Sequence, residues 1–535
     1  MVDTDKIKKA APAKKKAGEA APAKKKAGEA APAKKKAGEA APAKKKAGEA
    51  APAKKADKPK KSAAKAREAQ SLQRAVYFDA NSTAIAPEAV VETVARWMNR
   101  GNPSAAYASA REARDMMELF RRRLAEEGAF ELSGPGGAAG SGDGGAYRLL
   151  FTSGASESNC HVVTAAVRAY AARTGRAPHV ILTAVEHWSL LACVRRLVRD
   201  GLTTATYLEP ETEGEAFGSV GRRALEEALR ANPDTCLVTV MAANNETGVV
   251  NDLKSLAAAA RARGVPFHTD AVQVYGRASL RPGALGLDAF SASFHKMGGP
   301  PGVGLLAISE SFHEGYRLPP HICGTQNGGL RGGTENVPGI AGAFVAFRRA
   351  MERRPEKNAE CRRLRDRVWA GLKRHFRCVF YREFAAARAA EQAEARPQGA
   401  ESLREGAGRA EGRALAQELA AARRAGNPVV VWLAPLELER LLPNTMLLAV
   451  SRPDFCNVRA RAALEKRGVI VSVGSACNTS SPEASHVIDA LKVPAELRPG
   501  VLRVSLPDGA TESEADRFVA AFAGVVAGGD CCREP

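Results

Sequence analysis

The sequence predicts an α/β fold with at least two packed domains, and three observations support this prediction. From Val76 onward, short apolar segments that end in polar or glycine clusters alternate with stretches of helix length rich in Ala, Leu and Arg. Continuous apolar strands of this kind are typical of a parallel sheet that helices cover on both faces. The chain has 535 residues, more than one hydrophobic core normally serves, so a second domain is expected.

The composition is that of an ordinary soluble globular protein, with 45% hydrophobic and 26% charged residues. The sequence has no apolar run of about 18 residues, and its start carries no apolar signal segment, so we expect neither a membrane span nor secretion by that route. Ten cysteines without regular spacing or a C-x-x-C pair predict neither a disulfide framework nor a metal site. They suit a reducing compartment.

Residues 1–74 are predicted to form a disordered, basic tail. Four copies of Ala-Ala-Pro-Ala-Lys-Lys-Lys-Ala-Gly-Glu run from Ala10 to Glu49, and they offer no side chain large enough to build a core. Residues 1–70 hold 22 Lys and Arg against 8 Asp and Glu, which is +14 of the +20 of the whole chain. Two functions stay open for this tail: contact with nucleic acid or another polyanion, and simple solubilisation. Lys in place of Arg and a regular Glu argue against a mitochondrial presequence, so a cytoplasmic or nuclear location is favoured.

The elements of the body follow in order along the chain. The clearest strands are predicted at Arg148–Phe151, Val180–Thr183, Cys236–Met241, Val265–His268, Val429–Leu433 and Thr445–Val450, and a closing helix lies near Glu512–Val526. Two insertions interrupt the pattern: Gly134–Gly145, which is rich in glycine, and residues 383–427, whose composition favours a solvated helix without an apolar stripe. We expect a large domain over 75–345, a small domain over 346–526 and a flexible end over 527–535.

Polar residues that follow apolar strands are the first candidates for a site, since an open α/β sheet binds ligands at the carboxyl ends of its strands. Phe151 leads into Thr152-Ser153-Gly154-Ala155-Ser156-Glu157 and a helical stretch, where free N–H groups beside hydroxyls would cradle a phosphate. The same residues also read as a helix capping box, the more common interpretation of such a segment. Asp270, just after a predicted strand, is either a site carboxylate or a turn residue.

Two further residues stand where reactive groups are needed. Lys296 lies between an apolar strand and a glycine-rich turn, and a buried amine loses its proton more easily, which Schiff-base formation with an aldehyde requires. Cys477 follows the run Val469–Val473 in a loop of small residues, where a thiolate would reach a substrate. A phosphate cradle, a carboxylate and an amine are together what pyridoxal phosphate uses, so this cofactor is predicted.

Ten sequence blocks then occur in one order: Tyr77-Phe78-Asp79-Ala80-Asn81-Ser82-Thr83, Gly101-Asn102-Pro103-Ser104, Phe151-Thr152-Ser153-Gly154-Ala155-Ser156-Glu157-Ser158-Asn159, Glu186-His187, Asn244-Asn245-Glu246-Thr247-Gly248, His268-Thr269-Asp270-Ala271-Val272-Gln273, His295-Lys296, Arg331-Gly332-Gly333-Thr334-Glu335-Asn336, Pro443-Asn444-Thr445 and Gly474-Ser475-Ala476-Cys477. With these blocks the chain, from about Tyr77 to Val526 outside the insertions, resembles the cysteine desulfurases of the class V aminotransferase family and their relatives, the selenocysteine lyases. The resemblance implies the type I fold of pyridoxal phosphate-dependent transferases, with a mainly parallel seven-stranded sheet in the large domain and a smaller α+β domain after it. It also implies that the first strand and helix of the large domain partly join the small domain.

The resemblance also implies roles for individual residues. Lys296 would carry the pyridoxal phosphate, Asp270 would pair with its ring nitrogen, and His187 would stack on the ring and move protons. The remaining cofactor contacts implied are Asn245 and Gln273 at the ring substituents, and Ala155, Ser156, Ser293, His295 and, from a second subunit, Thr334 at the phosphate. A homodimer is therefore implied.

For the substrate, the resemblance implies that Asn102 and Arg503 hold the carboxylate of L-cysteine, since an Arg fork suits a bidentate grip. The Cys477 thiolate would attack the substrate sulfur, leaving L-alanine and a persulfide on Cys477 that an acceptor protein collects for iron–sulfur cluster assembly or tRNA thiolation. Phe294 stands where the family usually has Gly, so either the turn before Lys296 is distorted or the ring covers the cofactor.

Two other functions stay open. A selenocysteine lyase would carry much the same blocks, and a polyanion-binding protein with an inactive pyridoxal domain would make the basic tail the working part. Among the remaining cysteines, Cys160, Cys193 and Cys236 lie in apolar patterns and are predicted to be small core residues. Cys323, Cys531 and Cys532 receive no role.

Overall fold

The protein is described by a computed structural model over residues 75–133, 145–394, 407–435, 437–474 and 485–528. The predicted basic tail, most of the glycine-rich insertion and Cys477 lie outside these described residues. Within them, no helix combines the length and the apolar character that crossing a membrane requires.

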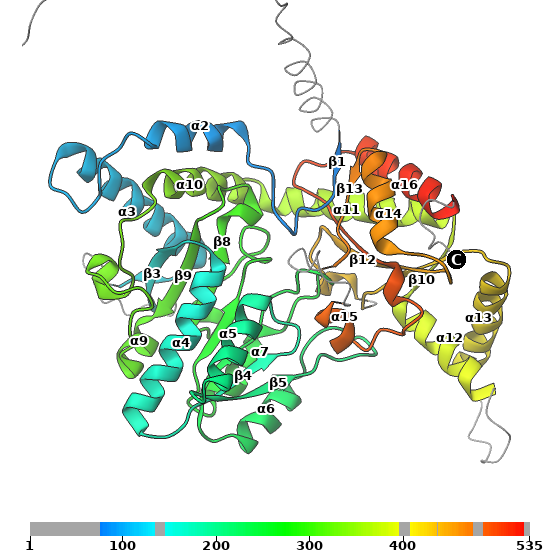
Figure 1. Ribbon diagram of the computed structural model, residues 1–535, viewed down its shortest axis with the longest axis horizontal. Helices are drawn as coiled ribbons and strands as arrows, with labels where there is room; N and C mark the ends of the chain where they lie inside the picture. The colour runs from blue at the N-terminus through cyan, green and yellow to red at the C-terminus, as the bar shows by residue number, and fades with distance from the viewer. Residues whose placement is uncertain (1–74, 134–144, 395–406, 436, 475–484, 529–535) are drawn as a thin grey trace, which may run out of the picture. The chain divides into compact units, whose positions relative to one another are not determined.

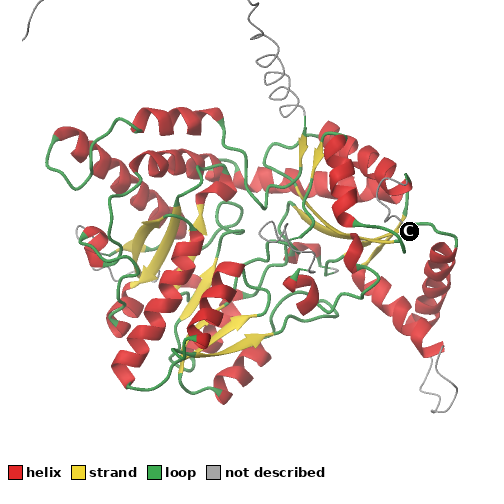
Figure 2. Ribbon diagram, in the orientation of Figure 1, coloured by secondary structure: helices red, strands yellow, loops and turns green. Residues whose placement is uncertain are grey.

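The large domain is built on one eight-stranded sheet, in the order β2-β3-β9-β8-β7-β6-β4-β5 (Figures 1 and 2). Its strands are β2 (Glu131–Leu132), β3 (Ala146–Thr152), β4 (His179–Thr183), β5 (Thr204–Leu208), β6 (Thr235–Thr239), β7 (Phe267–Asp270), β8 (Ala289–Ser293) and β9 (Gly304–Ser309). Only β9 runs antiparallel to its neighbours, and the two-residue edge strand β2 adds an eighth strand to the predicted seven. The mainly parallel α/β architecture that the sequence predicts is confirmed.

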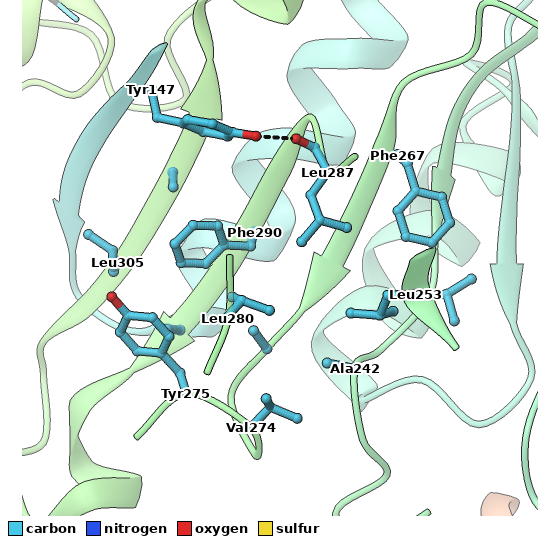
Figure 3. Packing of buried hydrophobic residues seen from close by; sticks show 14 of the residues in the cluster. Tyr147, Ala242, Leu253, Phe267, Val274, Tyr275, Leu280, Leu287, Phe290 and Leu305 are labelled. Carbon is cyan, nitrogen blue, oxygen red and sulfur yellow. Dashed lines mark hydrogen bonds between the residues drawn. The ribbon is translucent and has the colours of Figure 1, made fainter. Parts of the chain in front are cut away.

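Helices cover both faces of this sheet, as its fully apolar strands require. They are α2 (Glu88–Trp97), α3 (Ala108–Gly128), α4 (Ala155–Thr174), α5 (Trp188–Arg199), α6 (Arg222–Ala231), α7 (Leu253–Arg261), α8 (Pro282–Leu285), α9 (Glu310–Tyr316) and α10 (Val337–Met351), with short 3-10 turns η1 (Phe294–Met297) and η2 (Gln326–Gly329). Helices α3, α6, α7 and α10 contribute to one apolar cluster, and α4, α5 and α9 to another. Figure 3 shows part of the first cluster, which includes Phe267 and Phe290, and the hydrogen bond that the Tyr147 hydroxyl donates to the Leu287 carbonyl (2.5 Å).

The small domain has a four-stranded sheet in the order β10-β11-β12-β14 and a separate two-stranded pairing of β1 with β13. The strands are β1 (Val76–Tyr77), β10 (Arg377–Phe380), β11 (Val429–Trp432), β12 (Thr445–Ser451), β13 (Val469–Ile470) and β14 (Val501–Ser505). The helices are α11 (Arg354–Lys373), α14 (Asn457–Lys466), α15 (His486–Ala490) and α16 (Glu512–Ala527), with 3-10 turns η3 (Leu438–Arg440) and η5 (Arg498–Gly500). The parallel pairing of Val76 with Val469 builds the first described strand into the domain formed by the last third of the chain.

The second insertion folds differently from its prediction as a solvated helix. It forms two helices, α12 (Tyr381–Glu394) and α13 (Ala407–Arg424), that lie against each other (Figure 1). Phe384 and Leu419 are fully buried in a cluster with Val431 of β11 and Leu447 of β12. The prediction was wrong because a few large side chains among many alanines suffice to make a narrow buried stripe, which the composition conceals.

Candidate active site

One cavity of about 410 Å3 lies at the carboxyl ends of the large sheet and gathers most of the predicted site residues. Of those residues, Ala155, Ser156, His187, Asn245, Asp270, Gln273, Ser293, His295, Lys296 and Arg503 line it. They come from the ends of β3, β7 and β8, from the loops after β4 and β6, and from β14 of the small domain. The arrangement follows from the parallel sheet, whose strand ends meet at one edge.

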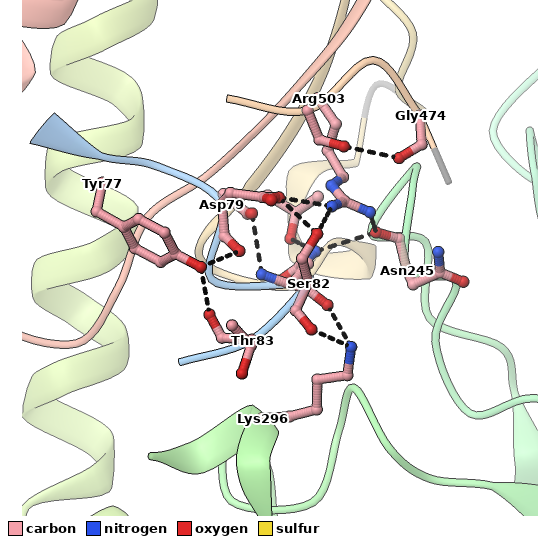
Figure 4. A network of polar contacts seen from close by, with 12 residues as sticks. Tyr77, Asp79, Ser82, Thr83, Asn245, Lys296, Gly474 and Arg503 are labelled. Atoms are coloured by element: carbon pink, nitrogen blue, oxygen red, sulfur yellow. Dashed lines mark hydrogen bonds and ion pairs between the residues drawn. The ribbon is translucent and has the colours of Figure 1, made fainter. Parts of the chain in front are cut away.

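Lys296 enters the cavity from the short turn η1, which directly follows β8. The turn ends at Gly298, whose φ of 82° is a left-handed conformation that favours glycine. The Lys296 Nζ donates hydrogen bonds to the carbonyl oxygens of Asn81 (2.8 Å) and Ser82 (2.7 Å), in the loop after β1 (Figure 4). The amine is therefore partly buried on the cavity wall and tied to the small-domain strand that precedes this loop.

Phe294, two residues before Lys296, neither distorts the turn nor covers the cavity. Its ring is fully buried and lies 5.3 Å, centroid to centroid, from the Phe120 ring in the core of the large domain. A backbone oriented for Lys296 to face the cavity thus directs the Phe294 side chain into the core. Both alternatives that the sequence left open for this position are wrong.

Asp270 ends β7 with only 4% of its surface exposed. Its Oδ2 accepts a hydrogen bond from Asn159 Nδ2 (2.8 Å), and its Oδ1 accepts one from the backbone N–H of Val272 (3.0 Å). The second bond is the turn contact that sequence alone makes plausible, and the first fixes the carboxylate toward the cavity. Asp270 is therefore both a turn residue and a site carboxylate.

Ser189, in the first turn of α5, connects Asp270's partner with His187. Asn159 Nδ2 also donates to Ser189 Oγ (3.0 Å), and the same oxygen lies 2.9 Å from His187 Nδ1. The backbone N–H of Ser189 donates to His187 Nδ1 (3.2 Å), which caps the helix. Because Nδ1 accepts this bond, a neutral His187 ring carries its proton on Nε2. Asn159 occurs in one of the sequence blocks, but neither it nor Ser189 was predicted as a site residue; the spacing of Asn159 one turn after Ser156 was the available indication.

The start of α4 presents the predicted phosphate cradle. Its N-cap residue, Gly154, makes no side-chain cap, so the capping-box interpretation holds only in part. Glu157 accepts from the backbone N–H of Ser153 (2.7 Å) and forms an ion pair with Arg331 (2.8 Å). Burial opposes the charge of Glu157, but these bonds outweigh it and lower its pKa. The N–H groups of the first turn remain for an anion, which the helix dipole also favours.

His295 lies beside this cradle without adding charge to it. Burial is the main cause that lowers its pKa to about 4, and the neighbouring Lys296 and His187 act in the same direction. Its Nδ1 lies 3.0 Å from the Thr83 hydroxyl. At neutral pH the ring is therefore neutral and acts toward an anion as a hydrogen-bonding group.

Arg503 reaches the cavity from β14 and is 1% exposed. Its Nη2 donates to Asp79 Oδ1 and to Ser82 Oγ, both at 2.6 Å, and its Nη1 donates to the Asn245 carbonyl oxygen at 3.1 Å (Figure 4). The guanidinium thus joins the loop after β1 to the loop after β6. The ion pair with Asp79 was not expected from the sequence.

Three predicted residues are not placed in the cavity by the described chain. Asn102 is exposed, its Oδ1 accepts from the Ser104 backbone N–H (2.9 Å), and it is not among the residues that line the cavity. Its predicted contact with the substrate carboxylate stays a prediction, which this single chain does not place at the cavity. Thr334 is also exposed outside the cavity. Cys477 lies outside the described residues.

Two buried carboxyl groups beside the cavity were missed as functional residues. Glu186 is fully buried, and burial, with the nearby Asp270 as a second cause, raises its pKa to about 8. Its Oε1 accepts from the Met241 backbone N–H (2.7 Å) and from the Thr183 hydroxyl (3.0 Å). Glu246 lines the cavity, and burial raises its pKa; its Oε2 accepts from Ser485 Oγ (2.8 Å). Both residues occur in the sequence blocks, but their positions in the sequence do not indicate that they are buried.

The donor groups on this wall fit pyridoxal phosphate. The helix start at Ala155 matches a phosphate, the fixed carboxylate of Asp270 matches a protonated ring nitrogen, and the primary amine of Lys296 matches an aldehyde. All three line the same cavity, whose volume is about 410 Å3.

Comparison with known proteins agrees with this fit. The model of the family described as aminotransferase class-V matches residues 76–430. A cysteine desulfurase from Bradyrhizobium diazoefficiens is 31% identical over 454 residues, covering 84% of this chain and 94% of that protein. One from Gluconacetobacter diazotrophicus is 30% identical, covering 85% and 94%. A solved structure described as a NifS-like protein is similar with a TM-score of 0.63 and 26% identity, covering 85% of this chain and 99% of its own.

Proposed function

Because the chain belongs to the class-V aminotransferase family and to its cysteine desulfurase branch, we propose that it is a pyridoxal phosphate-dependent cysteine desulfurase. In the overall reaction, free L-cysteine and the thiol of Cys477 become L-alanine and a persulfide on Cys477. The sulfur of the substrate leaves its carbon and bonds to the sulfur of Cys477, so that no atom is gained or lost.

One observation carries this proposal: Lys296, Asp270 and Arg503 line a single cavity although they come from distant parts of the chain. Bound pyridoxal phosphate supplies an aldehyde carbon and an electron-withdrawing ring. Lys296 offers its amine at the cavity wall, and Asp270, held by Asn159 and the Val272 N–H, is oriented to keep a proton on the ring nitrogen. His187, whose neutral ring has its proton on Nε2, is placed to exchange protons inside the cavity.

Arg503 is the residue that we assign to the substrate carboxylate. Its Nη2 is already committed to Asp79 and Ser82, whereas the acceptor at Nη1 is the neutral carbonyl oxygen of Asn245. A carboxylate competes well with a neutral carbonyl for a guanidinium N–H, because charge-assisted hydrogen bonds are stronger. We therefore infer that substrate binds on the Nη1 side, while Asp79 fixes the guanidinium in position.

Further steps require partners. We infer that an acceptor protein collects the sulfur from Cys477, for iron–sulfur cluster assembly or for tRNA thiolation, and that Thr334 reaches the phosphate site of a second subunit in a homodimer. The reducing compartment that the cysteines suit is the cytoplasm or the nucleus.

The proposal is tested with the full-length protein and two variants. The purified protein should take up pyridoxal phosphate with a visible absorption band and should release alanine and sulfide from L-cysteine. Lys296→Ala should lose the covalent cofactor band and alanine formation. Cys477→Ala should keep the band but lose persulfide and sulfide formation. A colourless protein that takes up no added pyridoxal phosphate would contradict the proposal.

The same assay separates the alternatives that the sequence leaves open. L-cysteine and L-selenocysteine are compared side by side at equal concentration. Activity confined to selenocysteine would identify a selenocysteine lyase. Strong polyanion binding without alanine formation from either substrate would identify the tail as the working part.

A further inference from the structure

Cys160 and Cys193 do not lie in the core as the sequence predicts. Cys236 is fully buried in β6, but Cys160 on α4 and Cys193 on α5 are both partly exposed. The apolar pattern around them misleads because α4 and α5 pack side by side on one face of the sheet, which brings a position from the flank of each helix to the seam between them. The two thiols therefore lie at this seam, and both are partly exposed.

Each cysteine at this seam contacts a residue of the opposite helix. Cys160 and Thr164 are one turn apart on α4, and Ser189 and Cys193 are one turn apart on α5. The Cys160 Sγ lies 3.7 Å from the Ser189 carbonyl oxygen, and the Cys193 Sγ lies 3.8 Å from the Thr164 hydroxyl. Each thiol therefore contacts the helix that carries the other thiol. Both sulfurs thus lie in the same one-turn stretch of the seam between α4 and α5.

The two thiols differ in pKa. The influence of Cys160 is the main cause that lowers the pKa of Cys193, and the Thr164 hydroxyl also lowers it, although burial opposes both. The influence of Cys193 and burial raise the pKa of Cys160. Cys193 is therefore the first of the pair to become a thiolate, the form that attacks disulfides.

The pair is connected to the cavity through Ser189. The carbonyl oxygen of Ser189 contacts Cys160, and its hydroxyl contacts both Asn159 and His187. Asn159, the neighbour of Cys160 in the chain, holds the carboxylate of Asp270. A change in the distance between the two helices at the cysteines would therefore displace residues that orient the cofactor-binding groups.

We propose that Cys160 and Cys193 form a site of reversible oxidation that takes an intramolecular disulfide. The Cys193 thiolate attacks one sulfur of a low-molecular-weight disulfide, forming a mixed disulfide and releasing one thiol. The Cys160 sulfur then loses its proton and attacks the Cys193 sulfur, which expels the second thiol. The pair loses two electrons and two protons, and the small disulfide gains them as two thiols.

The oxidation itself is tested by mapping disulfides in the full-length, cofactor-loaded protein. After incubation with oxidised glutathione and blocking of free thiols with N-ethylmaleimide, digestion should yield a peptide pair joined through Cys160 and Cys193, which dithiothreitol releases. Cys193→Ser should slow glutathione attachment at this site at least tenfold. Cys160→Ser should leave glutathione attached to Cys193. Cys323→Ser, the matched control at an exposed lone cysteine, should not change the joined pair.

Absence of the joined peptides, or equal rates of glutathione attachment in the two single variants, would overturn the proposal. The effect on the cofactor rests on the proposed function and is measured separately, in the Cys477→Ala background, as the rate at which bound pyridoxal phosphate is lost after dilution. Oxidation should raise this rate at least threefold, and an unchanged rate would refute the coupling through Ser189. If the protein takes up no pyridoxal phosphate at all, the proposed function fails while the peptide mapping still decides the oxidation.

Discussion

Two carboxyl groups lie near one another at the active site: Asp270 lines the cavity, and Glu186 is buried close to it. Burial and the charge of Asp270 raise the pKa of Glu186 to about 8, so Glu186 keeps its proton at neutral pH and adds no second negative charge. Protonation stabilises the buried side chain, because a neutral carboxyl group needs fewer hydrogen bonds than a buried carboxylate. Only its Oε1 has partners among the described residues, and Oε2 has none.

The first prediction concerns the pH dependence of stability that follows from Glu186. Its pKa rises on folding from 4.5 to about 8, so its contribution is fully present below about pH 4.5 and is lost as the pH rises through 8. Relative to Glu186→Gln, which cannot titrate, the free energy of unfolding of the wild type should fall by about 1.4 kcal/mol per pH unit within this window. Urea unfolding of both proteins between pH 5 and pH 8 measures the difference. The exposed Glu209→Gln serves as the control and should follow the wild type; parallel curves for wild type and Glu186→Gln would contradict the prediction.

The second prediction concerns Asn159, whose side chain holds the carboxylate of Asp270. Asn159→Ala removes a hydrogen bond to a charged group, which is worth about 1.5–3 kcal/mol, so the affinity for pyridoxal phosphate should fall by about 10- to 100-fold. Titration of the protein with the cofactor, followed by absorbance, measures it. Ser189→Ala removes the other partner of Asn159 but leaves Asp270 bonded, and its effect should be smaller; the reverse order of the two variants would show that Asn159 does not act through Asp270.

At the scale of residues, sequence reasoning found the groups whose chemistry is unusual for their place, such as Lys296 before a glycine-rich turn. It missed Asn159, Ser189 and Glu186 because amides, hydroxyls and carboxyls are ordinary after a strand, and only the folded chain shows which of them are buried together. The position of Asn102 outside the cavity could not be predicted either, since a block that matches a family gives the identity of a residue but not which surface its side chain faces.

Among the elements, the helical hairpin α12–α13 shows where composition misleads. Its residues are mostly Ala, Arg, Glu and Gln, and the hydrophobic periodicity is carried by few side chains. Phe384 and Leu419 nevertheless pack on the small-domain sheet with Val431 and Leu447. The main strands, by contrast, were predictable within a few residues, because a strand buried on both faces is apolar along its whole length.

The third prediction tests whether the hairpin is part of the small-domain core. Phe384→Ala should destabilise the protein by about 3–5 kcal/mol, because it removes a fully buried aromatic ring and leaves a cavity. The unfolding midpoint in urea, followed by tryptophan fluorescence from the neighbouring core, measures the loss. Ala389→Ser, on the exposed side of α12, is the control and should change the midpoint little. An unchanged midpoint for Phe384→Ala would mean that the hairpin contributes nothing to the fold.

For the whole molecule, the charge is divided unevenly. Residues 1–70 carry +14 of the total of +20, so most of the attraction to polyanions belongs to the tail and little to the domains that contain the cavity. The α/β class and the presence of a second domain could be predicted from the sequence, because apolar periodicity indicates the first and chain length the second. The placement of β1 in the small domain was expected only from family resemblance, since no local pattern indicates a partner so far along the chain.

The fourth prediction follows from this division of charge. The full-length protein should bind double-stranded DNA at 50 mM salt and lose at least tenfold in affinity at 200 mM, because binding releases counterions. Deletion of residues 1–70, or replacement of the repeat lysines by Gln, should abolish the binding and leave alanine formation unchanged. Fluorescence anisotropy measures the affinity. Failure of the full-length protein to bind at 50 mM would favour the solubilising interpretation of the tail.

The pairing of Val76 with Val469 also determines when this part of the protein can fold during its synthesis. A ribosome adds about 5–20 residues per second, so the first strand emerges about 20–80 seconds before its partner has been made. Throughout that interval its backbone N–H and C=O groups have no strand to pair with, and the adjoining loop that receives the Lys296 amine has no fixed position. The hydrogen bonds of Lys296 to this loop are therefore completed only after nearly the whole polypeptide has been made. A truncated nascent chain cannot carry a finished active site.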